Sequence, residues 1–200
     1  MMVTVVDLGG GSALQRPATD TLALAVAPAL AEAGGGFQVQ VYVNGTEMTS
    51  RGAGLGMDPY DLLVPTNRLV ATTEPHTVGI ARCVCGVYGC ASTDIIIVRD
   101  GDRVHWEWLY DKPMERGVTF PADAYDAEVT RVAEDHSWET PDRTAGRLVL
   151  LNVDRERLRP YGLHVSWVAN DYVDPETAKK VQQEKLVQVG VGIKMNDRGL

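Results

Sequence analysis

Hydrophobic and polar positions alternate through the first half of the chain, with the period of two that a strand with one buried face requires. Residues 21–26 (TLALAV) and residues 37–43 (FQVQVYV) both follow this pattern, and an Ala-rich helix is the alternative for the first of them. Asn44 and Gly45 come next and predict a type I′ turn, because both of its central positions need positive φ. We therefore expect the two segments to pair and a short strand to return over residues 46–48.

Three further strand-like segments follow one another closely: VGIARCVC over residues 78–85, IIIV over 95–98 and VHWEW over 104–108. Glycine-containing connections at residues 86–89 and at Asp100–Gly101 predict tight turns between them. The sequence therefore predicts a three-stranded antiparallel meander. On its third strand, Trp106 and Trp108 share one face, which favours a packing role for both.

The hydrophobic period lengthens to that of an amphipathic helix over residues 121–135. A second helix is predicted from Thr140, as N-cap, with Pro141 at the first helical position, to about residue 158. The two would form a helical hairpin. Alternation returns in residues 163–169 and 186–193, which predict two closing strands, with a short helix between them that begins at Asp174.

This order of elements predicts an α+β fold rather than alternating βαβ units. A chain of 200 residues is long enough to bury one sizeable core. We expect a flexible N-terminal segment over residues 1–20 and a single domain over 21–200, in which a mostly antiparallel, twisted sheet packs against the two-helix hairpin.

The charge composition restricts the kinds of partner that the chain is expected to bind. The formal charge is −8, with 19 basic against 27 acidic residues, so the chain lacks the excess of Lys and Arg that binding to nucleic acid or to anionic membranes needs. The start has no secretory signal pattern, and no apolar run reaches the roughly 20 residues of a membrane span. The cysteines are crowded together rather than spread as disulfide staples, which favours a reducing, cytoplasmic location.

The most specific local motif is C-x-C-G-x-x-G-C, with cysteines at positions 83, 85 and 90. If Gly86–Gly89 forms the turn, Cys85 and Cys90 become cross-strand neighbours and Cys83 lies on the same face. Three thiolates suit zinc, whose structural sites are tetrahedral, so the pattern predicts a candidate zinc site. The nearby candidates for a fourth ligand are His76 and His105.

Two alternatives remain open for the motif. Cys85 and Cys90 could form a redox pair, because directly opposed strand residues have the Cα separation that a disulfide requires. Alternatively, the three cysteines could be small buried hydrophobes that pack under the sheet with Ile95 and Ile97.

Two weaker candidates lie elsewhere. The segment Asp7–Ser12 (DLGGGS) has glycines that could bring backbone amides to the phosphate of a nucleotide or to a methyl donor. A second group combines His136 with Glu128, Asp135 and Glu139, beside Trp138, and a histidine flanked by carboxylates can serve as a general base or as half of a metal site. Neither completes a known catalytic motif, so no catalytic residue is assigned.

Several stretches carry a resemblance beyond these motifs: VYVNG, MDPYDLL, ARCVCGVYGC, VHWEW, and YDAEVTRVAEDHSWETPDR followed by GRL. Over most of the chain after residue 20, the sequence resembles a set of uncharacterised proteins of actinobacteria and similar high-GC bacteria. The resemblance implies a bacterial protein and no particular activity. The function expected from the residues is therefore a non-catalytic protein-binding or accessory domain, and the alternative is a zinc- or thiol-dependent protein that uses the three cysteines.

Overall fold

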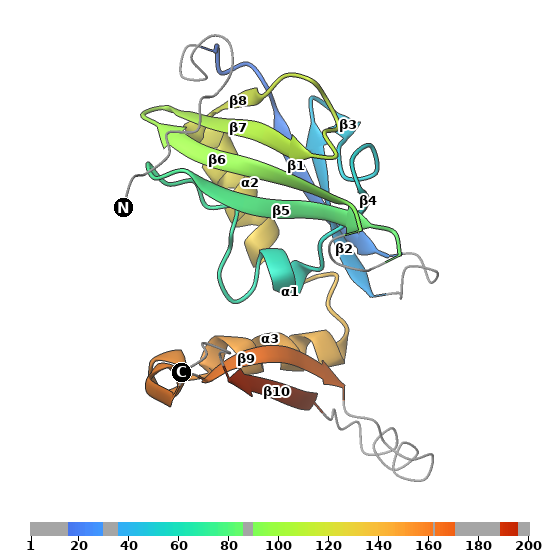
Figure 1. Cartoon of the computed structure of the whole chain (residues 1–200), viewed down its shortest axis with the longest axis vertical. Coiled ribbons are helices and arrows are strands. Elements are labelled where there is room, and N and C mark those ends of the chain that lie inside the picture. Colours follow the sequence, from blue (N-terminus) through green and yellow to red (C-terminus); the bar gives the residue numbers. More distant parts are fainter. Residues whose placement is uncertain (1–15, 30–35, 86–89, 162, 171–188, 196–200) are drawn as a thin grey trace. The chain divides into compact units, whose positions relative to one another are not determined.

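A computed structural model describes residues 16–29, 36–85, 90–161, 163–170 and 189–195. The chain divides into two compact units, residues 1–135 and residues 136–200, and each is described by itself (Figure 1). The expected single domain over residues 21–200 stays a prediction, because compactness is a different property from cooperative folding. Residues 1–15 of the expected flexible segment, and the helix expected from Asp174, lie outside the described residues.

The first unit contains two antiparallel sheets, which confirms the α+β class and its antiparallel character. A curled five-stranded sheet follows chain order: β4 (Gly54–Gly56), β5 (His76–Cys83), β6 (Ser92–Asp100), β7 (Arg103–Tyr110) and β8 (Val118–Pro121). The predicted meander forms its centre. A smaller sheet contains β1 (Leu22–Pro28), β2 (Phe37–Val43) and β3 (Thr46–Glu47).

The predicted pairing of the first two strands is confirmed, and so is the predicted turn between the second strand and β3. Leu24 lies opposite Val41 in the β1–β2 pair, so the alternating apolar residues share one buried face. Asn44 and Gly45 have φ of 52° and 74°, which is the conformation that the type I′ turn requires. The strand interpretation of residues 21–26 therefore holds against the helical one.

Backbone hydrogen bonds join the two sheets at both margins. Met57 lies between β2 and β5: its carbonyl accepts from the Val39 amide at 2.8 Å, and its own amide donates to Ile80 at 3.1 Å. At the other margin, the Asp20 amide donates to the Thr119 carbonyl on β8 at 3.1 Å. The two sheets thus enclose a single hydrophobic core.

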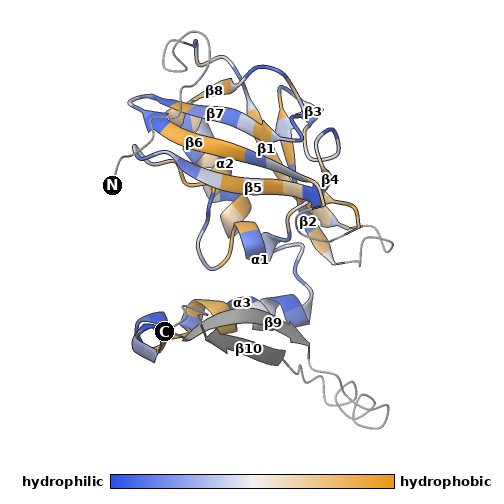
Figure 2. Cartoon of the chain, in the orientation of Figure 1, coloured by the Kyte–Doolittle hydropathy of each residue, from blue (hydrophilic) through white to orange (hydrophobic). Residues whose placement is uncertain are grey.

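Aromatic side chains fill that core beneath α2 (Ala122–Glu134). The Trp106 ring lies 5.1 Å from Phe120 and 5.8 Å from Tyr125, in edge-to-face arrangements that aromatic pairs favour. The Tyr125 hydroxyl donates to the Leu69 carbonyl at 2.6 Å, so the one polar atom of this buried ring is satisfied. Figure 2 shows how hydropathy varies along β6: the central part of the strand is hydrophobic and its two ends are hydrophilic.

The second unit is built on a pair of antiparallel strands, β9 (Leu163–Asn170) and β10 (Val189–Met195), as the closing alternation predicted. The helix α3 (Pro141–Asn152) contacts both strands. The single helix expected to reach residue 158 ends at Asn152 instead. Asp154 then caps the short helix α4 (Arg155–Leu158), and a 3₁₀ turn over Arg159–Tyr161 follows.

The structure differs from the sequence-based expectation in three further places. The two predicted helices belong to different units: within the first unit α2 contacts β1, β7 and β8, and within the second α3 contacts β9 and β10. The short strands β4 and β8 were not predicted, because neither has local alternation; β4 pairs with β5, and β8 pairs with β7. In the described part of the expected N-terminal segment, Asp20 is buried against β8 and Arg16 pairs with Glu107. Among the described residues, no helix has the length and apolar character to span a membrane.

Candidate metal centre

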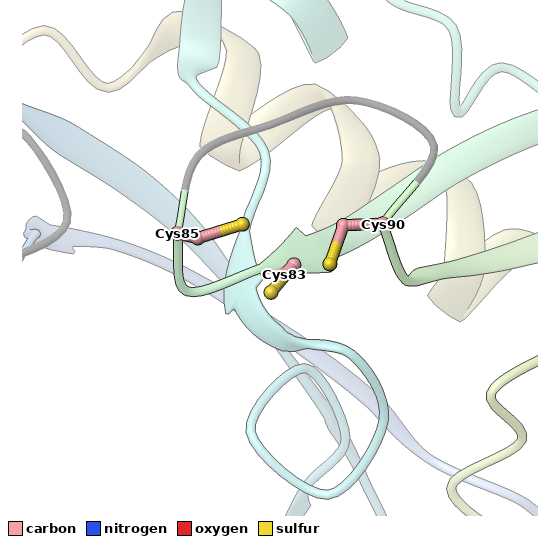
Figure 3. A group of neighbouring side chains, drawn as sticks. All are labelled: Cys83, Cys85 and Cys90. Carbon is pink, nitrogen blue, oxygen red and sulfur yellow. The ribbon is translucent and has the colours of Figure 1, made fainter.

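The three cysteines lie around the connection between β5 and β6. Cys83 is the last residue of β5, and its amide donates to the Ala91 carbonyl at 3.0 Å. Cys85 and Cys90 lie beyond the two strands and project toward one another, with Cys83 between them (Figure 3). All three sulfur atoms lie within 4.8 Å of one another.

The structure corrects the predicted cross-strand pairing of Cys85 with Cys90. The alternating pattern predicted a strand through Cys85 and a cross-strand pair with Cys90, but β5 ends at Cys83 and β6 begins only at Ser92. Within a continuous strand, side chains at i and i+2 stand about 7 Å apart, which is too far for their sulfurs to bind the same metal ion. Because the chain leaves the ladder after Cys83, Cys85 is free of that spacing and approaches Cys83.

Exposure contradicts the interpretation of the cysteines as buried packing residues. Cys83 is half-buried, and Cys85 and Cys90 are exposed. Ile95 and Ile97, the proposed packing partners, are completely buried. The reason is again the early end of β5, which places two of the thiols outside the sheet. None of the three cysteines forms a disulfide in this structure.

A buried threonine near the start of β6 joins two neighbouring segments of the chain. The Thr93 hydroxyl on β6 accepts from the Ala53 amide at 2.8 Å and donates to the Asp111 carbonyl at 2.7 Å. It thus links the chain entering β4 to the chain leaving β7. Thr93 is completely buried, so both of its hydrogen bonds form where water does not compete.

Glycines let the chain pass close to this threonine and to the cysteines. A Cβ at Gly52 would collide with the Thr93 hydroxyl, and a Cβ at Gly54, whose φ is +110°, would come 2.9 Å from the Val84 side chain. Gly54 is paired with Cys83 across the β4–β5 ladder. Sequence analysis missed Thr93, Gly52 and Gly54 because none of them belongs to a local motif; a short glycine-rich segment was their only signal.

The neighbouring thiols oppose ionisation of Cys90. Its side chain hydrogen-bonds to Cys83 and to Cys85, and negative charge on either neighbour adds to the effect, so the pKa of Cys90 rises to about 11. The thiol is therefore protonated at neutral pH in the absence of a cation. A bound cation would reverse this preference, since it stabilises thiolates.

The sulfur spacing fits a zinc ion after a small adjustment. Zinc–thiolate bonds of about 2.3 Å in a tetrahedron place the sulfurs about 3.8 Å apart. The observed limit of 4.8 Å thus requires contraction by about 1 Å at most. Because Cys85 and Cys90 are exposed and lie outside the ladder, rotation of their side chains can supply it.

The two histidines expected as fourth ligands are not brought to the cysteines. His76 begins β5, seven residues before Cys83, and its Nε2 lies 3.1 Å from the Arg68 carbonyl oxygen. A strand rises about 3.3 Å per residue, so the length of β5 separates them. His105 is completely buried, with its Nδ1 2.9 Å from the Thr119 hydroxyl, and burial lowers its pKa.

The strand pairing in the five-stranded sheet explains why both histidines lie far from the cysteines. His105 lies opposite Val98, and His76 lies opposite Ile97, so the two occupy the same end of the five-stranded sheet. Cys83 occupies the other end, beside Gly54. Within the described residues, the cluster of metal-ligating side chains at this end consists of the cysteines alone.

The other candidate groups have structural partners or lie outside the described residues. Glu128 forms an ion pair with Arg131 and accepts from the Leu24 amide, which ties α2 to β1. The Glu139 side chain is buried and accepts two hydrogen bonds from Arg147, and His136 Nδ1 lies 3.6 Å from its carboxylate. Asp7–Ser12 lies outside the described residues.

Comparison with known proteins adds no assignment: no protein-family model, curated protein or solved structure matches the chain. The chemistry of the cysteine cluster is therefore the basis for a functional proposal.

Proposed function

We propose that the protein binds one zinc ion through the thiolates of Cys83, Cys85 and Cys90. The observation that carries this proposal is the convergence of the three sulfurs to within 4.8 Å at one end of the five-stranded sheet. Residues 84 and 85 leave the ladder there, which brings together side chains that a regular hairpin would hold apart.

The electrostatics favour a metal over a thiol-based redox site. Reactive cysteines have lowered pKa values and lie beside a positive charge or a helix N-terminus. Here the pKa of Cys90 is raised to about 11 by the two neighbouring thiols. Such a thiol is a poor nucleophile at neutral pH, whereas a divalent cation would relieve the mutual repulsion of three thiolates. For Cys90, cation binding is therefore favoured over direct attack as a thiolate.

A zinc ion at this position would cross-link the ends of two strands. It would connect the last residue of β5 with Cys90, two residues before β6, and so close the connection between them. Ordering of a surface connection by a structural metal is compatible with the role expected from the sequence, that of a non-catalytic accessory domain.

The test is native mass spectrometry of the reduced, full-length protein, together with elemental analysis after dialysis against zinc. We expect one zinc per chain in the unmodified protein. Cys85→Ser and Cys90→Ser should each lose the ion under the same dialysis, because a serine hydroxyl is a much weaker zinc ligand than a thiolate.

The matched control is Val84→Ser. It places a serine between Cys83 and Cys85 at an exposed position and keeps all three thiols, so zinc binding should be unchanged. Equal zinc content in all variants would place the ion elsewhere, and a metal-free protein after dialysis against zinc would overturn the proposal.

The expectation of a protein-binding domain stays a prediction with one supporting observation. Leu148 and Leu151 on α3 are about half exposed, at 50% and 51%, and their spacing of three residues places them on one helix face. The substitutions Leu148→Lys and Leu151→Lys would weaken association with a partner if this face carried it, and Tyr161→Lys would serve as an exposed control.

A further inference from the structure

We infer that zinc at the cysteine cluster keeps a fourth coordination position open toward solvent, and that this position takes an imidazole supplied by another molecule. The inference rests on the proposed zinc site and adds the ligand class that completes it. Zinc in protein sites is almost always four-coordinate, and three protein ligands plus one exchangeable ligand is an established arrangement.

The first step is the donor count. In the part of the chain that the structure describes, the cluster contains three sulfur ligands and no histidine or carboxylate. His76 and His105 belong to the opposite end of the sheet, where the pairing of β5, β6 and β7 holds them. The fourth donor must therefore come from beyond this cluster.

The second step is access. Cys85 and Cys90 are exposed, and only Cys83 is half-buried. Figure 3 shows Cys83 between these two exposed cysteines. A ligand arriving from outside can thus reach the ion without displacing core side chains.

The third step is charge. A zinc ion with three thiolates has a net charge of −1, on a chain whose formal charge is already −8. A fourth thiolate or a carboxylate would add another negative charge to this anionic centre. A neutral donor avoids this repulsion, and imidazole is the neutral side chain that zinc prefers.

The test uses cobalt in place of zinc in the full-length, reduced protein. The sulfur-to-cobalt charge-transfer intensity reports the number of thiolates, and the ligand-field bands report coordination number and the other donors. We expect the charge-transfer intensity of three thiolates. Titration with N-acetylhistidinamide should then shift the ligand-field bands to saturation without loss of charge-transfer intensity.

Glutathione provides the comparison with an anionic thiol donor. We expect its half-saturating concentration to be about tenfold higher than that of N-acetylhistidinamide, because it adds charge to an anionic centre. Val84→Ser should respond as the unmodified protein does. Nitrogen-donor bands that grow with protein concentration before any addition would identify a second copy of the chain as the source of the imidazole. Absence of a nitrogen donor at every concentration before the addition would leave a separate molecule as its source.

The inference is overturned if N-acetylhistidinamide leaves the bands unchanged, if glutathione binds as tightly, or if the cobalt protein already has a nitrogen or fourth sulfur donor at every concentration. Each of these outcomes presupposes bound cobalt. Failure of the protein to bind cobalt or zinc at all would instead contradict the proposed function, so the two failures are distinguishable.

Discussion

Asp20 and Arg116 form a two-point ion pair across 96 positions of sequence: Nη2 lies 2.7 Å from Oδ1 and Nη1 lies 3.1 Å from Oδ2. The Thr119 amide and the Asn44 side chain donate to the same carboxylate, at 2.9 and 2.7 Å. The carboxylate therefore binds the start of β1, the β2–β3 turn and β8 into one arrangement. These side-chain hydrogen bonds reinforce the backbone hydrogen bond between Asp20 and Thr119.

This ion pair predicts a stability loss in acid. Burial opposes ionisation of Asp20, but the hydrogen bonds from Arg116, Thr119 and Asn44 outweigh it and lower the pKa from 3.8 to about 2. A group whose pKa is lowered by folding stabilises the protein above its unfolded pKa. We expect about 1–2 kcal/mol of stability at neutral pH to be lost as pH falls from about 4 to about 2.

Denaturant unfolding of Asp20→Asn across this pH range checks the prediction. The variant should be less stable at pH 7 and should lack this component of the acid dependence. Asp102→Asn is the control, because Asp102 is almost fully exposed and its nearest contact with Arg103 is 3.6 Å. That variant should stay within about 0.5 kcal/mol of the unmodified protein. Parallel pH profiles for the unmodified protein and Asp20→Asn would contradict the assignment.

Local alternation predicted β1, β2 and the central meander well because each of these strands has one face in the core. Leu24 and Val41, for example, follow the same period and meet in the observed register. The pattern did not predict β4, whose sequence Gly-Leu-Gly has no period and whose Gly54 and Gly56 pair with Cys83 and Ala81 of β5. The strand depends on a distant partner, and no local signal reports it.

The candidate site shows the same limit. The cysteine motif was visible in the sequence and its sulfurs do converge, but the register within it was wrong because the end of β5 depends on tertiary contacts. The histidines were chosen for their proximity along the chain. In an extended sheet such proximity means little, since His76 and Cys83 occupy the two ends of one strand.

The Thr93 hydroxyl should stabilise both the fold and the metal site. Thr93→Val keeps the shape and removes both hydrogen bonds, which leaves the Ala53 amide and the Asp111 carbonyl without this partner. We expect a loss of about 1–3 kcal/mol in the free energy of unfolding, together with weaker zinc binding. Thr93→Ser keeps the hydroxyl and should retain most of the zinc affinity. Equal zinc affinity in Thr93→Val and Thr93→Ser would show that the Thr93 hydroxyl does not contribute to zinc binding.

Zinc affinity should depend steeply on pH. Binding requires thiolates, and the Cys90 thiol has its pKa raised to about 11 by its neighbours, so zinc must displace protons at neutral pH. Release of two to three protons would raise the apparent affinity by about a hundredfold to a thousandfold per pH unit. Calorimetric titrations in buffers with different ionisation enthalpies count these protons. Release of fewer than one proton would show that the cluster does not bind zinc as thiolates.

Glu139 should be important for the stability of α3 in the second unit. Its side chain is 1% exposed, and its two oxygens lie 2.7 Å and 3.1 Å from the Arg147 guanidinium, with the Thr144 hydroxyl donating at 3.0 Å. Glu139→Gln removes the charge that compensates Arg147 in a buried position, and such changes cost about 3–5 kcal/mol. Hydrogen exchange should therefore accelerate across α3.

The control for this prediction is Glu156→Gln on α4. Glu156 is 76% exposed and pairs with Arg159 at 3.2 Å, in the kind of surface ion pair whose contribution is below about 1 kcal/mol. Exchange in α3 should be unchanged in this variant. If both substitutions altered exchange equally, the start of α3 would not depend on the buried ion pair, and the stability of the helix would have to come from its contacts with β9 and β10.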